Sequence, residues 1–189
     1  MSIVILVAIA AAGCASPMSS FYTLDAVAVP EGTPAARLTV AVGPVTIPAG
    51  IDRPEFVVQT APNRVELDEF HRWAAPLGET IASVVAQDLG ALLGTPHVVV
   101  GTFPGVDPAF RVRIDVQRFE SALGKDVLVD AAWVVYGVSG RQPRAGRTTV
   151  REPLSGKDFD GIAAAHSRAL ATLSADIAKA IRDDSTRHR

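Results

Sequence analysis

Apolar and polar residues alternate most regularly in the stretch from Ala109 to Phe119. The apolar positions are Phe110, Val112, Ile114 and Val116, and the polar positions between them are Arg111, Arg113, Asp115 and Gln117. A period of two is the repeat of a β-strand, whose successive side chains point to opposite faces. The pattern therefore predicts a strand with one face in the core and the other face exposed or paired with polar partners.

Apolar residues recur at helical spacing in two stretches, residues 76–93 and 158–182. Pro76 suits the first turn of a helix, where its missing N–H costs nothing, and Gly94 suits the C-terminal stop. Asp158 is the expected N-cap of the second helix. We therefore predict two helices, followed by a polar tail at residues 183–189 that frays.

Shorter apolar or alternating runs predict the remaining strands. They cover residues 21–24, 37–48, 55–60, 64–69, 97–103, 127–138 and 147–151. Gly43-Pro44 should break or bulge its strand, and Pro62-Asn63 should close a hairpin. The nearly continuous apolar run at 127–138 predicts a central strand covered on both faces, and an exposed turn at 139–146 leads to an edge strand.

These elements predict one α+β domain at residues 21–182, with a mostly antiparallel mixed sheet and two main helices packed on one face. No internal repeat or low-complexity segment is visible. The 18 basic and 20 acidic residues give a net charge of −2, which argues against a nucleic-acid partner because a phosphate backbone requires a clustered positive surface.

The N-terminal stretch IVILVAIAAAGCAS ends its apolar run at Cys14, which is the only cysteine. This run is too short for a transmembrane helix and matches the apolar region of a secretory signal. It resembles the lipobox of bacterial lipoproteins. We therefore expect a signal peptide at residues 1–13, an acylated Cys14 and a lipid-anchored spacer at residues 14–20. The alternative is a buried structural cysteine.

Residues that could support catalysis are scarce. The sequence has no spare cysteine nucleophile, no G-x-S-x-G motif and no glycine-rich phosphate-binding pattern. His166 and Ser167 are sequence neighbours, but adjacent helical residues point about 100° apart and cannot form a base–nucleophile pair. Because His166 lies on the apolar stripe of its helix, we interpret it as a hydrogen-bonded core or interface histidine.

Three further groups of residues have both a functional and a structural interpretation. Glu66, Asp68 and Glu69 beside His71 could suggest metal ligands, but strand alternation separates them and a solvated face is favoured. Arg111 and Arg113 could meet lipid headgroups or a partner's carboxylates, or could pair with Asp115 and the neighbouring strand. Trp133 is expected in the core. Trp73 could line a groove or pack as an anchor, and packing is favoured.

Several segments resemble the ABC-transport auxiliary lipoproteins, and within them the paraquat-inducible protein C (PqiC) type. They are Asp52-Arg53-Pro54-Glu55, Asn63 to Leu67 (NRVEL), Glu69 to Leu77 (EFHRWAAPL), and the weaker Phe21 to Leu24 (FYTL), Asp115 to Phe119 (DVQRF) and Ala165 to Leu170 (AHSRAL). The resemblance covers nearly the whole chain after Cys14.

The resemblance implies a non-enzymatic outer-membrane lipoprotein that faces the periplasm and serves an MCE-type intermembrane lipid transport system. Its partner would be an MCE-domain protein, its only attached group would be the covalent lipid on Cys14, and it would form a homo-oligomer. The residues expected to shape a partner or oligomer surface are Arg53, Pro54, Arg64, Phe70 and Trp73. The alternative is a periplasmic module that binds a lipid or small ligand in a cleft.

Overall fold

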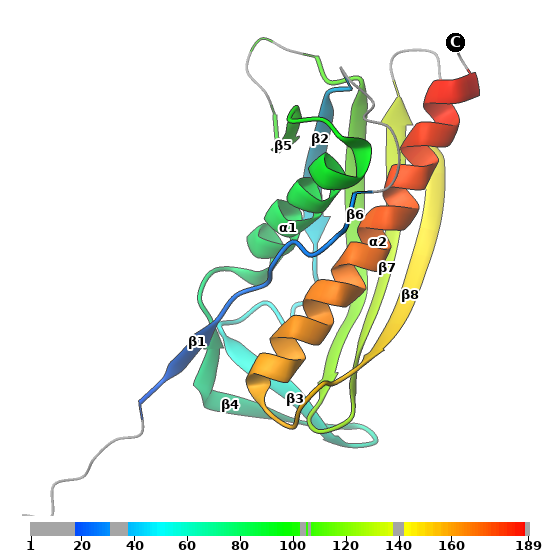
Figure 1. Ribbon diagram of the computed structural model, residues 1–189. Coiled ribbons are helices and arrows are strands. Elements are labelled where there is room, and N and C mark those ends of the chain that lie inside the picture. The colour runs from blue at the N-terminus through cyan, green and yellow to red at the C-terminus, as the bar shows by residue number, and fades with distance from the viewer. Residues whose placement is uncertain (1–17, 31–37, 103–104, 106, 138–141, 188–189) are drawn as a thin grey trace, which may run out of the picture.

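The computed structural model (Figure 1) describes residues 18–30, 38–102, 105, 107–137 and 142–187. The strands are β1 (Ser20–Tyr22), β2 (Val40–Thr46), β3 (Glu55–Ala61), β4 (Arg64–Trp73), β5 (Val98–Val100), β6 (Phe110–Ala122), β7 (Asp126–Gly137) and β8 (Arg144–Pro153). The helices are α1 (Leu77–Leu93) and α2 (Phe159–Arg187).

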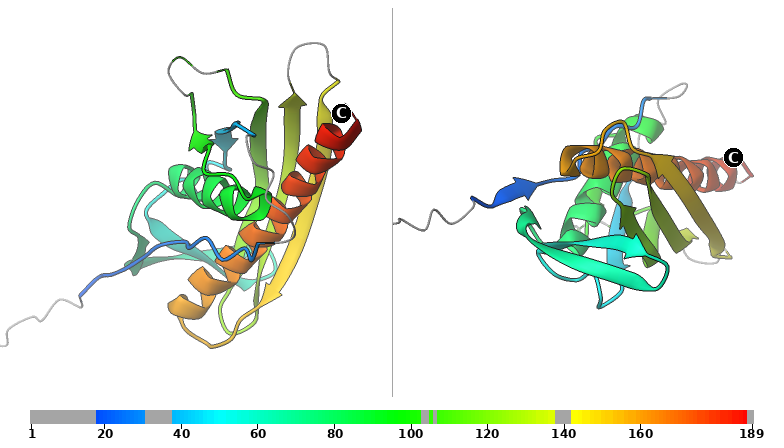
Figure 2. Two further views of the ribbon diagram at one scale, coloured as in Figure 1. Left: turned by 45° about the horizontal axis from the view of Figure 1, so that its top comes forward. Right: turned by 90° about the horizontal axis from the view of Figure 1, so that it is seen from below.

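The sheet is organised around β6, the longest strand. One edge of β6 pairs with β7, which pairs with β8, and both of these long ladders are antiparallel. The other edge of β6 pairs with two parallel strands, with β2 along its first half and with β3 near its end. The strand β2 carries β5, and β3 carries β4 and then β1. The result is the expected mixed sheet, which curls because β3 and β4 leave the plane of β7 and β8 (Figure 2).

Both helices pack against one face of this sheet, with α1 over β2 and α2 over β7 and β8 (Figures 1 and 2). The alternation of β6 is confirmed, because Phe110, Val112, Ile114 and Val116 are buried under the helices whereas the residues between them are exposed. The prediction of a single α+β domain is therefore correct. Within the described part of the chain, neither helix combines the length and apolar character that a membrane span requires.

The predicted helix ends are largely confirmed. Pro76 directly precedes α1, Gly94 ends it in the left-handed conformation (φ 63°), and the Gly161 N–H donates to Asp158 Oδ1 at 2.9 Å as an N-cap bond. The predicted fraying of the tail is wrong for residues 183–187, which continue α2. Arg182 Nη2 donates to the Leu92 carbonyl at 2.5 Å, so the last turns pack on the end of α1.

Several strand boundaries differ from prediction. The strand β4 continues to Trp73, β5 ends at Val100, and β8 begins at Arg144 inside the predicted turn. The expected bulge in β2 is present as a register shift between Val42 and Val45. Burial of both faces of β7 holds over residues 127–131, after which its positions alternate between buried and half-buried.

Trp133 lies in the core as predicted, and its indole Nε1 donates to Thr148 Oγ1 at 3.1 Å. The ring lies directly against Gly146 on the neighbouring strand β8, where a Cβ atom would approach it to 2.2 Å. Glycine is therefore required at residue 146 for steric reasons.

Candidate interaction surface at the N-terminal arm

The N-terminal arm crosses the outside of the helix layer. We call residues 23–30 the strap, which follows β1 and passes over α1 and α2 (Figure 1). The Asp25 N–H donates to Ser167 Oγ at 3.1 Å, and the Ala28 N–H donates to Asp88 Oδ1 at 3.0 Å. Leu24, a residue of the strap, has a buried side chain. These contacts fix the arm to both helices.

Asp88 connects the strap to both helices from a fully buried position on α1. Its second carboxylate oxygen accepts a hydrogen bond from Ser174 Oγ of α2 at 3.2 Å. Burial raises the pKa of Asp88, and the hydrogen bonds from Ala28, Ser174 and Val27 only partly oppose this. The strap is therefore bound through Ala28 to the Asp88 carboxylate, whose charged form is disfavoured by its buried surroundings.

The hairpin of β3 and β4 extends beyond the helix-covered part of the sheet. Its two-residue turn places Asn63 at φ 63°, and Arg64 Nε donates to Thr60 Oγ1 at 3.1 Å, so the predicted hairpin is confirmed. A bulge interrupts β4, and there Asp68 Oδ1 accepts the N–H groups of Phe70 and His71. The bulge lets β4 turn and continue to Trp73.

Asp68 is thus a structural carboxylate. It also contacts His71 Nδ1 at 2.8 Å. Burial alone would raise the pKa of Asp68, but the hydrogen bonds from His71 and from the two backbone N–H groups together lower it. The favoured interpretation of a solvated acidic face is therefore wrong for Asp68 and correct for the exposed Glu66 and Glu69. Among the residues that the structure describes, no group of three or more potential ligands could hold a metal ion.

A cluster of aromatic side chains packs the hairpin of β3 and β4 against β1 and α2. Trp73 stacks on Phe56 with ring centroids 4.1 Å apart, and His71 stacks on Phe159 of α2 at 3.8 Å. Tyr22 of β1 packs edge-on against Phe56 at 5.3 Å. Sequence reasoning missed this cluster, since each strand contributes one or two rings and no local spacing links them.

His166 extends the cluster into the core, as expected for a buried histidine. Its ring stacks on Phe119 at 3.7 Å, and its Nε2 shares a hydrogen bond of 2.9 Å with Ser121 Oγ. Its other ring nitrogen has no hydrogen-bond partner in the described structure. Burial lowers the pKa of His166 to about 3, because an imidazolium would be desolvated here. Ser167 does not pair with His166. Its hydroxyl donates to the Ala163 carbonyl and accepts from the strap.

The outer side of β4 and β1 exposes four large apolar side chains, which we call the apolar stripe. Their exposed fractions are 65% for Phe21, 59% for Val65, 48% for Leu67 and 42% for Phe70. Tyr22 and Trp73 are register partners that point into the aromatic cluster, so the adjacent pair of Phe21 and Arg72 points outward. The stripe thus lies on the face of the hairpin that is turned away from the core.

The five residues predicted to shape a partner or oligomer surface differ in their exposure to solvent. Arg53 is half-buried, Pro54 and Arg64 are exposed, and Phe70 belongs to the apolar stripe. Trp73 is only 7% exposed and acts as the packing anchor that the sequence favoured. Its backbone N–H donates to the Pro54 carbonyl at 2.7 Å. Trp73 therefore shapes this surface only from beneath. Cys14 lies outside the described residues.

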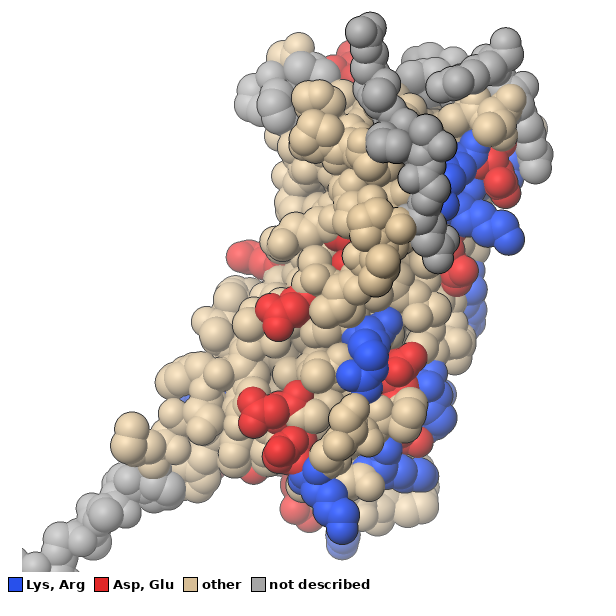
Figure 3. Space-filling view, viewed as in Figure 1, with Lys and Arg blue, Asp and Glu red and all other residues tan. Residues whose placement is uncertain are grey.

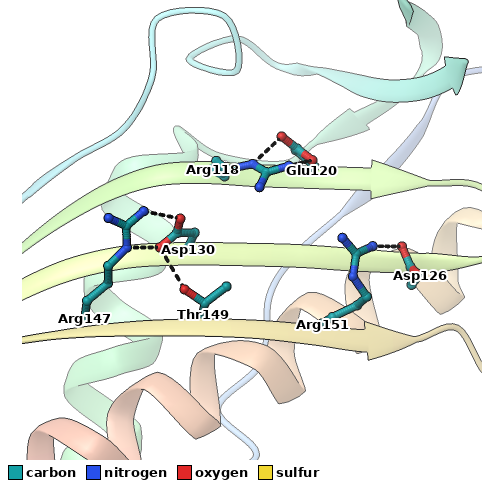
Figure 4. A network of polar contacts seen from close by, with 7 residues as sticks. All are labelled: Arg118, Glu120, Asp126, Asp130, Arg147, Thr149 and Arg151. Carbon is teal, nitrogen blue, oxygen red and sulfur yellow. Dashed lines mark hydrogen bonds and ion pairs between the residues drawn. The ribbon is translucent and has the colours of Figure 1, made fainter. Parts of the chain in front are cut away.

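The open face of β6, β7 and β8 carries a network of polar contacts (Figure 4). Arg147 donates two hydrogen bonds to Asp130, at 2.8 and 2.6 Å, and Thr149 donates a third at 3.1 Å. The bond from Arg147 is the main cause that lowers the pKa of Asp130. The expected pairing of Arg111 or Arg113 with Asp115 is not found, since Asp115 accepts from Thr46 and the carboxylate near Arg111 is Asp107 at 3.6 Å. On the opposite, helix-covered side, Lys and Arg gather over α2 and β8 (Figure 3).

A groove of about 1180 Å³ opens beside the bulge of β2. Its apolar lining includes Val45 and Ile47, and Ala82 contributes from α1. Arg111 and Arg113 also line the groove, together with the acidic Asp52 and Glu79. The arrangement joins an apolar wall to two guanidinium groups, which is a suitable composition for an amphiphilic ligand.

Comparison with known proteins places these features in context. The family model described as "ABC-type transport auxiliary lipoprotein component" matches residues 22–178. A crystal structure of a Xanthomonas campestris protein assigned to the DUF330 family model is 19% identical, with a TM-score of 0.71, and the match covers 88% of this chain and 99% of that chain. A second crystal structure, of an uncharacterized protein, is 19% identical with a TM-score of 0.72 and covers 87% and 99%.

Similarity at this identity shows a shared fold. The PelC dodecamer of Paraburkholderia phytofirmans also matches, at 16% identity and a TM-score of 0.42, over 77% of this chain and 92% of that chain. That lower similarity says nothing about the assembly of the present protein. No curated protein sequence matches the chain significantly.

Proposed function

The chain belongs to the ABC-type transport auxiliary lipoprotein family, and from this premise we propose that it is a non-enzymatic docking component of an MCE-type intermembrane lipid transport system, of the paraquat-inducible protein C type. In this proposal, acylated Cys14 anchors the protein on the periplasmic face of the outer membrane. Two or more acyl chains make such an anchor stable where a single chain would be marginal.

The observation that carries the proposal is the short path from the anchor to a fixed arm. Cys14 precedes Ser20 by six residues, a span of at most about 22 Å when fully extended. From Ser20 onward the chain is held by β4 and then by the strap contacts with Ser167 and Asp88. A protein held this closely and firmly suits a platform at the membrane surface better than a freely diffusing carrier.

The partner surface is proposed at three positions of the 53–73 segment, the half-buried Arg53 and the exposed Pro54 and Arg64. Trp73 supports this surface from the aromatic cluster, and the role of Phe70 is considered with the apolar stripe below. The partner is an MCE-domain protein. Docking onto a symmetric partner favours a symmetric homo-oligomer.

The anchor is tested by Cys14→Ser. We expect this variant to accumulate in the soluble periplasmic fraction or to stay unprocessed, because it lacks the acylated thiol. The matched control is Ser16→Ala, a neighbouring change that leaves the thiol in place and should leave fractionation unchanged. Unaltered outer-membrane fractionation of the Cys14→Ser protein would refute the anchor.

Docking is tested by photo-cross-linking in cells. A photoreactive residue at position 64 should capture an MCE-domain protein, whereas one at the exposed Lys179 on α2 serves as the control and should capture less of it. Capture of only unrelated proteins from position 64 would contradict the proposed partner.

A second candidate function is a lipid- or small-ligand-binding module, and the groove beside β2 is the observation that favours it. Native mass spectrometry of the purified protein tests this candidate. A co-purifying amphiphile whose binding is lost in Arg113→Glu would support a binding module, and the absence of any such ligand would count against it.

A further inference from the structure

The apolar stripe is an unusual feature for a free surface. Phe21, Val65, Leu67 and Phe70 are all large, all at least two-fifths exposed, and all on the same face of two paired strands. Scattered exposed apolar residues are normal, but several large ones on one face of a sheet are typical of a contact surface. The stripe therefore has an occupant that is absent from the isolated chain.

The position of the stripe identifies the surface nearest to it. Phe21 lies on β1, the strand that the N-terminal arm enters, and Phe70 lies on β4 beside it. If Cys14 carries the lipid, the path of at most about 22 Å to Ser20 keeps the end of the stripe at Phe21 and Phe70 within reach of the bilayer. Tethering at this length raises the effective concentration of the lipid surface far above that of any free partner.

The charged residues around the stripe suit an interfacial contact. Arg72 lies next to Phe21 in register, with one guanidinium nitrogen bonded to Glu55 at 2.6 Å. Long basic side chains at a membrane surface reach lipid phosphates while their stems cover apolar area. Glu69 is exposed beside Phe70, which limits the contact to the depth of the headgroups.

We propose that the apolar stripe rests on the membrane that holds the lipid anchor, with Phe21, Leu67 and Phe70 at the level of the lipid headgroups. This proposal depends on the anchor proposed above. It gives the protein two attachments to the bilayer, one covalent and one through β1 and β4. The orientation of the domain on the membrane is then fixed, because a body attached at two points cannot turn freely about its tether.

The experiment uses the full lipoprotein reconstituted in vesicles of phosphatidylethanolamine and phosphatidylglycerol. Because Cys14 is the only cysteine and is consumed by acylation, Leu67→Cys provides a single free thiol for a bimane fluorophore. Val65→Cys gives a second position on the stripe. The control is Val100→Cys on β5, a site with a similar exposed fraction of 50%. Vesicles whose lipids carry a nitroxide quencher on the headgroup then report contact between label and lipid.

We expect the fluorescence of the labels at positions 65 and 67 to shift to the blue and to be quenched by the headgroup nitroxide, and the label at position 100 to show neither change. Equal behaviour at all three positions overturns the proposal. Shielding of position 67 through cross-linking to a second copy also overturns it, since the stripe would then be an interface between copies. Vesicle flotation and the intact mass test the anchor separately. A floating, acylated protein without quenching refutes the stripe contact alone, and an unacylated protein that fails to float refutes both.

Discussion

Lowering the pH should destabilise this fold through a single buried side chain, His166. In the folded protein its imidazole stacks on Phe119 and bonds to Ser121, while its second ring nitrogen has no partner in the described structure. Protonation would place a charge and a second N–H donor in this apolar surrounding. The folded state therefore binds the proton much more weakly than the unfolded chain does.

The size of the effect follows from the two pKa values. Burial lowers the pKa of His166 from 6.5 to about 3, so the stability that depends on the neutral ring is full above pH 6.5 and is lost as the pH falls toward 3. At pH 5, about 1.5 pH units below the unfolded value, the loss is about 2 kcal/mol of unfolding free energy relative to pH 7. That is a sizeable part of the stability of an ordinary domain.

The assay is urea unfolding at pH 7 and pH 5, followed by circular dichroism. His166→Gln removes the titrating group, so the difference in unfolding free energy between the two pH values should shrink by about 2 kcal/mol, whatever its absolute stability. The matched control, His97→Gln, changes an exposed histidine and should keep the wild-type difference. An unchanged pH difference in His166→Gln would refute the assignment of the effect to His166.

Three further predictions concern Asp88, Gly146 and Asp130. Asp88→Asn should raise the thermal midpoint at pH 7, because burial raises the pKa of Asp88 and penalises its charge. That advantage should vanish near pH 4, where the protonated acid is itself favoured. Gly146→Ala should cost about 1–3 kcal/mol in urea unfolding, since its Cβ would meet the Trp133 ring, whereas Gly50→Ala enters open space and should cost far less. Asp130→Asn should lower the urea midpoint at pH 7, and the deficit should fade below pH 3.8 because the lowered pKa of Asp130 stabilises only the ionised form.

The parts of the fold that sequence reasoning found are those with a local periodic signal. The alternation in β6 and the capping residues Asp158 and Gly94 each act within a few residues, so pattern and structure agree there. The hairpin turn at Pro62-Asn63 is of the same kind. Local chemistry determines such features before any tertiary contact forms.

The parts that were missed depend on contacts between distant residues. The strand β4 continues past its polar stretch because the Asp68 carboxylate accepts the backbone N–H groups of the bulge. The alternation of apolar and polar residues gives no signal that a side chain takes the place of a backbone acceptor there. The strap is held by Asp88 and Ser167, which are 60 and 142 residues from their partners. The resemblance indicated the segment 53–73 but could not show that Trp73 faces inward.

The short strand β1 has a mechanical consequence. The strand direction of β1 is parallel to that of β4, and the sequence toward Cys14 continues from its first residue, Ser20. A pull on the anchor along that direction would load the backbone hydrogen bonds of Ser20 to Tyr22 together in shear, instead of opening them one after another. Behind them, the strap bonds at Ser167 and Asp88 would carry the remaining force into both helices. A tension between membrane and partner would thus be transmitted to the helix layer and the sheet together.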